Sequence, residues 1–116
     1  MSITVIILSI NRHHFIKRAI KYWDKKNYNV IIVDGSKKSY KFNKEDSNIT
    51  YYHKNISFID RIKFVVSKIK TEYCILSTDD DFVTIGGLEK YKDYLKKNKN
   101  IMSCIGHSLS FNIKKN

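Results

Sequence analysis

Short runs of apolar, mostly β-branched residues alternate with segments of helical periodicity, and this alternation restricts the fold more than any other feature. The runs occupy residues 3–10, 30–33, 49–52 and 73–77. Continuous apolar runs of this length are typical of strands buried on both faces of a sheet. Between them, apolar residues recur every three or four positions over 14–25 and from 57 onward, which indicates amphipathic helices. We therefore expect an α/β fold with an open, mostly parallel sheet flanked by helices.

The region from 57 to 113 carries the remaining predicted elements. Ser57, followed three residues later by Asp60, predicts a helix start. The buried stripe of this helix is predicted to comprise Phe58, Ile62, Val65, Val66 and Ile69. A further helix is expected at about 88–98, with Leu88, Tyr91 and Leu95 facing inward. Residues 101–113 are predicted to form one or two strands around Gly106, and the polar residues 35–48 an exposed loop.

The length of 116 residues predicts one domain over 1–116. Cys74 and Cys104 lie in apolar runs, which favours buried thiols over a disulfide or a zinc site. No apolar run approaches the roughly 18–20 residues of a membrane span. The start, Met1-Ser2-Ile3-Thr4, lacks the basic region of a signal peptide. We therefore expect a cytoplasmic protein.

The formal net charge of +11 permits three interpretations. Clustered Lys and Arg bind nucleic acid, and they also attract a protein to the anionic inner face of a membrane. The third interpretation is a compositional bias toward Lys, Asn and Ile. The lysines are spread along the chain without a recognised nucleic-acid-binding pattern, which favours the compositional interpretation. Peripheral membrane association stays open.

Three polar clusters follow predicted strands, at the places where those strands end. Ser9, Asn11 and Arg12 follow the first strand, Asp34-Gly35-Ser36 the second and Asp79-Asp80-Asp81 the fourth. Ligands of open α/β sheets bind beyond the carboxyl ends of the strands. The spacing therefore predicts that the three clusters share one rim of the sheet.

Asp79, Asp80 and Asp81 are the most informative of these residues. Adjacent carboxylates repel one another and raise each other's pKa unless a cation neutralises them. Their hard oxygen atoms suit Mg²⁺ or Mn²⁺, which usually binds one or two carboxylates together with substrate phosphates. A solvated acidic turn is the alternative. The position after a predicted buried strand, in a chain with only 11 acidic residues, favours the metal site.

Other polar residues are less informative by themselves. Asp34 before Gly35 is equally consistent with a simple turn and with a hydrogen-bonding partner for a base or ribose. Arg61 could reach a phosphate, although an exposed helix cation is the simpler interpretation. The four histidines lack metal-ligand spacing, so surface or packing roles are expected. They are His13, His14, His53 and His107.

The order and spacing of these motifs resemble family 2 glycosyltransferases. The first strand of that family, with its Asn-Arg turn, is similar to Ile6 to Arg12. The second strand, with its Asp-Gly-Ser end, is similar to Ile31 to Ser36. Tyr73 to Phe82 resembles the strand and DXD segment, in the Asp-Asp-Asp-Phe version of a bacterial glycosyltransferase-domain group. Gly106 to Phe111 is similar to a later segment of that group. The resemblance covers nearly the whole chain.

The resemblance implies a Rossmann-like N-terminal half of a GT-A fold that binds a nucleotide-diphosphate sugar and Mn²⁺ or Mg²⁺. Ser9, Asn11 and Asp34 would face the nucleoside, with Arg12 on the same rim, and Arg61 would approach the nucleotide. Asp79 and Asp80 would contact ribose and metal, and Asp81 the sugar or the metal. The acceptor would be a glycan, a lipid or a polysaccharide precursor.

The sequence departs from the family pattern in two respects. Ser9-Ile10 replaces the usual Thr-Tyr, which removes an aromatic side chain expected to stack on the base. The family's second half supplies the acceptor site and, in inverting enzymes, an acidic general base, and no residue of this chain is assigned that role. We therefore expect the chain to cover the donor-binding half, as a fragment, as a truncated gene product or as a minimal domain that needs a partner, in a homo-oligomer or with a partner chain.

Two other functions stay open at this point. Paired aspartates at a strand end also hold Mg²⁺ in enzymes that transfer phosphoryl groups on nucleic acid, although these usually need a further acidic residue at another strand end. A non-catalytic basic α/β domain that binds nucleic acid is the second alternative, and it predicts strong salt dependence without a metal requirement.

Overall fold

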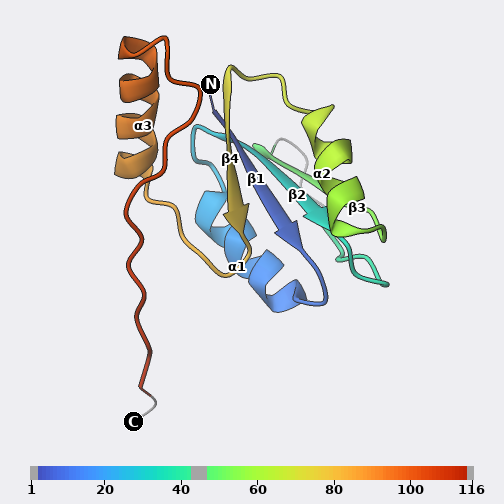
Figure 1. Ribbon diagram of the computed structural model, residues 1–116. Helices are drawn as coiled ribbons and strands as arrows, with labels where there is room; N and C mark the ends of the chain where they lie inside the picture. Colours follow the sequence, from blue (N-terminus) through green and yellow to red (C-terminus); the bar gives the residue numbers. More distant parts are fainter. Residues whose placement is uncertain (1–2, 43–46, 115–116) are drawn as a thin grey trace. The chain divides into compact units, whose positions relative to one another are not determined.

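The parallel sheet expected from the sequence is present. A computed structural model describes residues 3–42 and 47–114 of the chain, and Figure 1 shows its elements. In these ranges the elements are β1 (Ile3–Ser9), α1 (His13–Trp23), β2 (Asn29–Asp34), β3 (Ile49–His53), α2 (Phe58–Val66), β4 (Tyr73–Thr78) and α3 (Ile85–Lys97). The chain divides into two compact units, residues 1–82 and 83–116, which are described separately.

The first unit contains a sheet with the strand order β3-β2-β1-β4, and every neighbouring pair is parallel. In the centre, Ile6 of β1 lies opposite Ile31 of β2 and Leu76 of β4. The chain moves from β1 toward β2 in one direction and reaches β4 on the other side of β1. The order therefore reverses between β1 and β4, and such a reversal opens a ligand-binding crevice at the carboxyl ends of parallel strands.

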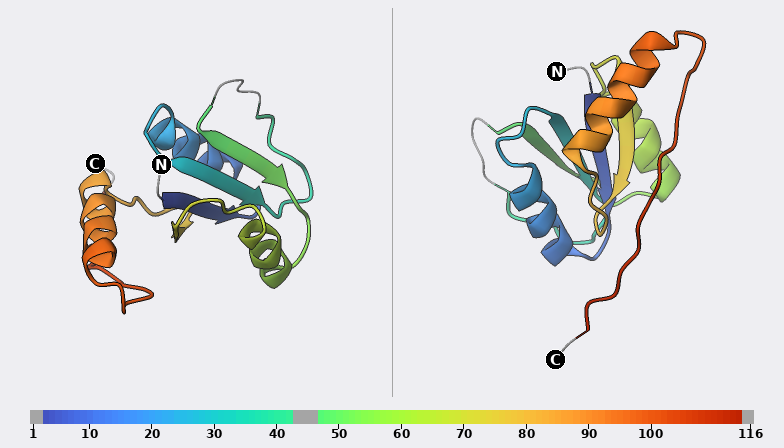
Figure 2. Two further views of the ribbon diagram at one scale, coloured as in Figure 1. Left: turned by 90° about the horizontal axis from the view of Figure 1, so that it is seen from above. Right: turned by 90° about the vertical axis from the view of Figure 1, so that its left-hand side faces the viewer.

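Helices α1 and α2 lie on opposite faces of this sheet, as Figure 2 shows. This follows from right-handed crossovers, because β1–α1–β2 and β3–α2–β4 progress across the sheet in opposite directions. On one face, Val65 of α2 packs with Ile6, Ile31 and Val33. On the other face, α1 contributes four buried side chains. These are Ile16, Ala19, Ile20 and Trp23.

The predicted fold class is confirmed, and the observed bounds of the first six elements lie close to those expected. The helix start at Ser57 is also confirmed, because the Ser57 hydroxyl accepts a hydrogen bond from the Asp60 backbone amide at 3.1 Å. The predicted loop at 35–48 contains no helix or strand over 35–42 and 47–48. Its residues 43–46, with Lys44, Glu45 and Asp46, lie outside the described residues.

The predicted buried stripe of α2 is partly wrong. Val65 is buried, but Phe58 and Val66 are more than half exposed, and the side chain buried beside Val65 is that of Arg61. The helix is therefore rotated so that a cation replaces an apolar residue on its inner face. The interactions that Arg61 makes there are described below.

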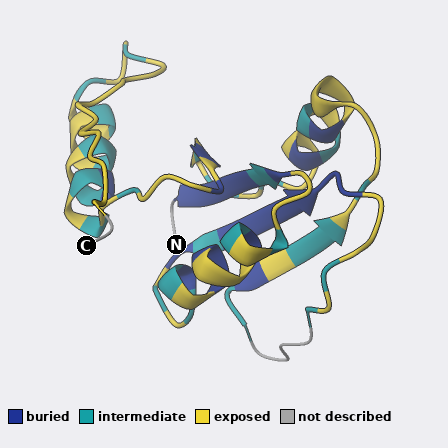
Figure 3. Cartoon of the chain, turned by 90° about the horizontal axis from the view of Figure 1, so that it is seen from below, coloured by how far each residue is buried: buried dark blue, intermediate teal, exposed yellow. Residues whose placement is uncertain are grey.

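The prediction that β4 is a buried strand with a buried Cys74 is wrong. Within the described part of the chain β4 is an edge strand, and alternate residues along it, including Cys74 and Leu76, are exposed. An edge strand is covered less completely than a central one, so the same apolar run is only partly buried. Figure 3 shows the contrast between β4 and the buried central strands β1 and β2.

The second unit contains α3 and the segment that follows it. Helix α3 starts after Thr84, whose hydroxyl accepts a hydrogen bond from the Gly87 amide at 3.2 Å. Leu88 is buried as expected, and Tyr91 and Leu95 are half-buried.

The predicted strands at 101–113 are wrong, since residues 98–114 contain no helix or strand. Apolar character favours a strand only where a neighbouring strand accepts its backbone hydrogen bonds, and in the described residues this segment pairs with none. Cys104 and His107 are consequently exposed, contrary to the buried thiol expected at Cys104. Among residues 3–42 and 47–114, none of the helices has the length and apolar character needed to cross a bilayer.

The orientation of α2 can be tested with two neighbouring valines. Val65→Ala removes two methyl groups from a side chain that is 1% exposed, so the free energy of unfolding should fall by about 2 kcal/mol. Val66→Ala, at a side chain that is 59% exposed, should change it by less than about 0.5 kcal/mol. Urea denaturation measures both, and equal losses would contradict the observed rotation of the helix.

Candidate functional site

Ser9, the last residue of β1 and a member of the first polar cluster, contacts the other two clusters predicted at the rim of the sheet. Its hydroxyl donates to Asp79 Oδ2 at 2.7 Å. Its carbonyl oxygen accepts from the Gly35 amide at 2.8 Å and from Arg61 Nη1 at 2.8 Å. The side chain is 3% exposed, so these bonds form away from solvent. The end of the central strand therefore fixes the positions of the acidic turn, the Asp-Gly-Ser segment and α2.

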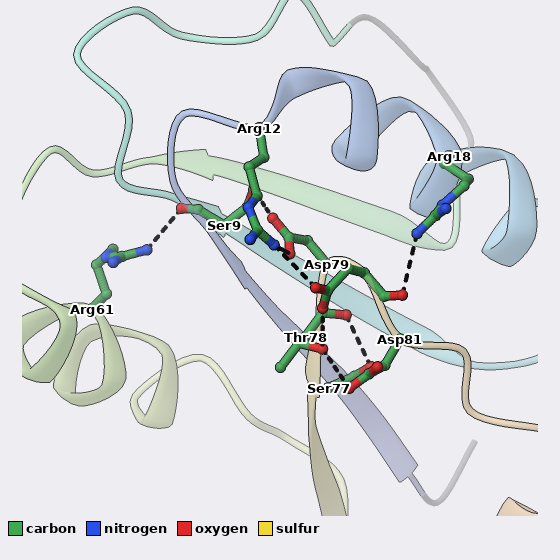
Figure 4. A network of polar contacts seen from close by, with 9 residues as sticks. Ser9, Arg12, Arg18, Arg61, Ser77, Thr78, Asp79 and Asp81 are labelled. Atoms are coloured by element: carbon green, nitrogen blue, oxygen red, sulfur yellow. Dashed lines mark hydrogen bonds and ion pairs between the residues drawn. The ribbon is translucent and has the colours of Figure 1, made fainter. Parts of the chain in front are cut away.

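The acidic turn after β4 is organised around Arg12, as Figure 4 shows. A single nitrogen atom of Arg12, Nη1, donates to Asp79 Oδ1 at 3.0 Å and to Asp80 Oδ2 at 3.2 Å. Asp79 is 6% exposed, whereas Arg12 and Asp80 are about half exposed, at 46% and 45%. The single positive charge of the guanidinium group thus offsets part of the negative charge of two adjacent carboxylates that would otherwise repel each other.

Thr78 also stabilises the turn from within. Its hydroxyl lies 2.9 Å from Asp80 Oδ1 and 2.7 Å from Asp81 Oδ2, and its single proton is shared between them. The hydrogen bond from Thr78 lowers the pKa of Asp80, and so do the hydrogen bond and the charge of Arg12. Partial desolvation raises this pKa, but by less, so the pKa of Asp80 lies below its usual value. Asp80 is therefore ionised at neutral pH.

Arg18 connects the same turn to α1. Its Nη2 donates to the Asp80 carbonyl oxygen at 3.2 Å. Its guanidinium carbon lies 4.6 Å from the ring centroid of Phe15 and 4.9 Å from that of Phe82. Such stacking favours a planar guanidinium over a lysine ammonium. The residue after the acidic triplet, Phe82, is in this way packed against the helix.

The Asp34 carboxylate, at the end of β2, is fully buried and accepts four hydrogen bonds. Oδ1 accepts from the Ser36 amide at 3.0 Å and from the Ser36 hydroxyl at 2.5 Å. Oδ2 accepts from Tyr51 Oη at 2.7 Å and lies 3.1 Å from His13 Nε2. A carboxylate only accepts, so His13 carries a proton on Nε2 in this arrangement.

These four hydrogen bonds keep Asp34 charged in spite of its burial. Burial alone would raise its pKa, but the hydrogen bonds from Ser36 and Tyr51 and the charge of His13 more than offset it and lower the pKa below 3.8. The effect on Tyr51 is reciprocal. Burial, together with the neighbouring Asp34 carboxylate, raises the pKa of Tyr51 to about 12. Tyr51 therefore remains a donor to Asp34 at neutral pH.

A hollow of about 400 Å³ lies next to Asp34 and is lined by Asn11, His13, Ser36, Lys37 and Lys38. Its volume is within the range of about 300–1,000 Å³ that is usual for small-ligand pockets. Asn11 adopts a left-handed backbone conformation with φ of 55°, and its amide donates to the Ser36 hydroxyl at 2.7 Å. Left-handed conformations of this kind occur often at ligand-binding sites.

Arg61 lies under the Asp-Gly-Ser segment with an exposed fraction of 4%. Besides the bond to the Ser9 carbonyl, its guanidinium group lies directly beneath Gly35, where a Cβ atom would come within 2.7 Å of Arg61 Cζ. Its Nε is buried and has no hydrogen-bond partner among the residues that the structure describes. The absence of a side chain at position 35 is therefore what permits Arg61 to reach β1.

Comparisons with known proteins identify the family of the chain. Residues 4–114 match the family described as glycosyl transferase family 2. The chain belongs to glycosyl transferase family 2. Curated proteins and solved structures gave no match. Enzymes of this family transfer a sugar from an activated donor to an acceptor, so family membership assigns glycosyltransferase chemistry to this chain in the broad sense.

The structure of this family 2 chain brings the predicted site residues together. Ser9, Arg12 and Asp79 are in direct contact, and Asn11 and Asp34 both bond to Ser36. Arg61 reaches the same rim through Ser9, so the simpler interpretation of an exposed helix cation is wrong. Asp80 and Asp81 are exposed and are linked to each other through Thr78.

Sequence reasoning missed four residues that stabilise this site. His13 and Tyr51 bind Asp34, Thr78 binds two aspartates, and Arg18 binds the acidic turn. His13 was expected at the surface or in packing because it lacks metal-ligand spacing. The signal that could have identified it is its position at the start of α1, two residues after Asn11, which lies on the same rim.

Whether the acidic turn suits a divalent metal can be judged from its donor atoms. Within residues 3–42 and 47–114, no group of three or more His, Cys, Asp or Glu side chains is gathered closely enough to hold a metal. Mg²⁺ in phosphate-binding sites, however, usually needs one or two carboxylates, because phosphates and water supply the remaining ligands. Asp80 and Asp81, which are exposed and share Thr78, meet that smaller requirement. The donor set therefore fits a metal that binds together with a diphosphate.

The charge on Asp34 should make the protein sensitive to acid. The folded pKa values of Asp34 and Asp80 lie below the ordinary 3.8, so their contribution to stability is complete above that value and is lost as the pH falls through the folded pKa values. Urea denaturation from about pH 7 to about pH 2 should show a loss that begins below about pH 4.

Asp34→Asn should weaken this acid dependence. It should also lower the free energy of unfolding at neutral pH by about 1–3 kcal/mol, because an amide cannot accept all four bonds. Tyr51→Phe, which keeps the carboxylate, should cost less, about 0.5–1.5 kcal/mol. An unchanged acid slope in Asp34→Asn would contradict this account.

The close approach of Arg61 to Gly35 gives a second test of the site. Gly35→Ala places a Cβ against the guanidinium carbon and should displace Arg61 from the Ser9 carbonyl, with a loss of about 1–3 kcal/mol in the free energy of unfolding. Gly86→Ala is the matched control, because a Cβ there meets nothing within 4 Å. Thermal unfolding compares the two, and equal effects would mean that Gly35 is not needed for the approach.

Proposed function

We propose that this chain is the donor-binding half of a family 2 glycosyltransferase, with a nucleotide-diphosphate sugar bound at the rim and Mn²⁺ or Mg²⁺ at Asp79, Asp80 and Asp81. The observation that carries the proposal is that the acidic turn, the Asp-Gly-Ser segment and Arg61 all bond to Ser9, at the point where the strand order reverses. The single domain assigned to 1–116 forms part of this proposal. The Asp-Asp-Asp-Phe segment takes the role of the DXD motif.

The hollow beside Asp34 is the proposed nucleoside site. Asp34 has no unused acceptor position, so its contribution is to orient His13 and Ser36, which line the hollow. Asn11, Lys37 and Lys38 add donors for the carbonyl oxygens of a base or the hydroxyls of a ribose. Ser9 and Arg61 support this arrangement from beneath rather than through contact with the nucleoside.

The acidic turn is the proposed site of the diphosphate and its metal. Asp80 and Asp81 offer exposed carboxylates, and Asp79 is held by Ser9 so that the turn keeps its position relative to β1. A divalent cation bound there would neutralise charge on the departing nucleoside diphosphate. Arg12 and Arg18 carry positive charge beside the same turn and can bind phosphate oxygens directly.

In this proposal the acceptor site, with the general base that deprotonates the acceptor hydroxyl, is completed by a second protein chain, either another copy in a homo-oligomer or a different partner. The acceptor is a glycan, a lipid or a polysaccharide precursor. Peripheral association with the inner face of the membrane, in a protein that is otherwise cytoplasmic, would suit an acceptor carried on a lipid. The net charge of +11 supports this part of the proposal.

Calorimetric titration with UDP and GDP, with and without Mn²⁺, tests the donor site. We expect binding of one nucleotide to depend on Mn²⁺ and to weaken at least tenfold in Asp80→Asn, because an exposed carboxylate that serves a cation is lost. Asp93→Asn, at an exposed position on α3, is the matched control and should bind as the wild type does.

Absence of nucleotide binding in both variants and in the wild type would contradict the proposal. Binding of DNA that weakens steeply with salt and ignores Mn²⁺ would then favour the nucleic-acid-binding alternative.

A further inference from the structure

One nitrogen atom of Arg12 lies between two carboxylates, as a bound cation would. Nη1 contacts Asp79 Oδ1 at 3.0 Å and Asp80 Oδ2 at 3.2 Å, and its two hydrogens serve one carboxylate each. The other oxygen of Asp79 accepts from Ser9, and the other oxygen of Asp80 faces Thr78. Both carboxylates are therefore satisfied by the protein itself.

The position of Arg12 also makes this arrangement reversible. Arg12 is the residue immediately before α1, and its side chain is 46% exposed. Its guanidinium carbon lies 5.2 Å from the ring centroid of Phe15, a contact that leaves the donor atoms able to turn toward another anion. Asp79, by contrast, is 6% exposed and is fixed by Ser9. Release of the pair would therefore move the arginine and leave the carboxylates in place.

We propose that Arg12 is a built-in counter-ion of Asp79 and Asp80 that competes with the divalent metal, so that metal binds tightly only when a nucleotide diphosphate gives Arg12 another partner. This inference rests on the proposed metal site at the acidic turn. It adds an order to binding: in the free protein Arg12 offsets part of the charge of the two carboxylates, and the diphosphate draws Arg12 away. The nucleotide and the metal then strengthen each other's binding, and by linkage they do so to the same extent.

Mn²⁺ binding to the protein without nucleotide tests this inference without any assay of activity. Electron paramagnetic resonance measures free Mn²⁺ in titrations of the wild type, Arg12→Gln, Arg12→Lys and Lys17→Gln. Arg12→Gln should bind Mn²⁺ roughly tenfold more tightly than the wild type, a coupling of ordinary size. Lys17→Gln removes one positive charge from an exposed position on α1 and should bind as the wild type does. Arg12→Lys keeps the charge and should stay close to the wild type.

Addition of UDP or GDP provides the second half of the test. The nucleotide should raise the Mn²⁺ affinity of the wild type by a larger factor than that of Arg12→Gln, because the variant has no competing arginine to release. Thermal unfolding gives an independent readout. Mn²⁺ alone should raise the Tm of Arg12→Gln more than that of the wild type, since Asp79 then lacks its counter-ion.

The outcomes separate this inference from the proposed function. If Arg12→Gln binds Mn²⁺ no more tightly than Lys17→Gln does, or if Arg12→Lys binds it as tightly as Arg12→Gln, the counter-ion inference is overturned. If nucleotide binding nevertheless still requires Mn²⁺ and Asp80, the proposed function is supported and only the counter-ion inference fails. If no variant binds Mn²⁺ with or without nucleotide, the metal site and the inference are overturned together.

Discussion

The candidate site depends on the hydrogen bonds of one residue at the end of the central strand. Through its carbonyl oxygen Ser9 binds the Gly35 amide and Arg61, and through its hydroxyl it binds Asp79. The carboxyl ends of parallel strands lie at one edge of the sheet, so the residues that follow neighbouring strands are close enough to bond to one another. Ser9 makes these connections from the strand that lies between β2 and β4. The rim is therefore anchored to β1, whose residues are almost all buried.

The sequence predicted the features that follow from local patterns. Apolar runs located the four strands of the described sheet, and the parallel order then placed Ser9, Asp34 and Asp79 on one rim, as observed. The start of α2 was predicted because the Ser57 side chain caps its first turn. These predictions succeeded because periodicity and capping depend on residues close together in the chain.

Properties that depend on distant neighbours were not predicted. The run 73–77 has the composition of a central strand. It is partly exposed because β4 lies at the edge of the described sheet, and periodicity does not reveal that position. Arg61 was taken for a surface cation because its partner, the Ser9 carbonyl, is 52 residues away. The segment 101–113 has strand-like composition without a paired neighbour in the described residues. Each of these errors concerns a contact between residues far apart in the sequence.

The two buried aspartates of the rim are stabilised in different ways, and this difference has a functional consequence. Asp34 receives four hydrogen bonds, three of them from the side chains of Ser36, Tyr51 and His13. Rearrangement there would leave a buried charge unsatisfied, which is costly, so this part of the rim is preorganised. Asp79 receives one bond from buried Ser9 and one from Arg12, which is half exposed. Solvent or a ligand can replace that second bond at little cost. The side of the rim near Asp34 is therefore suited to recognition of a fixed shape, and the side near Asp79 to an exchange of cations.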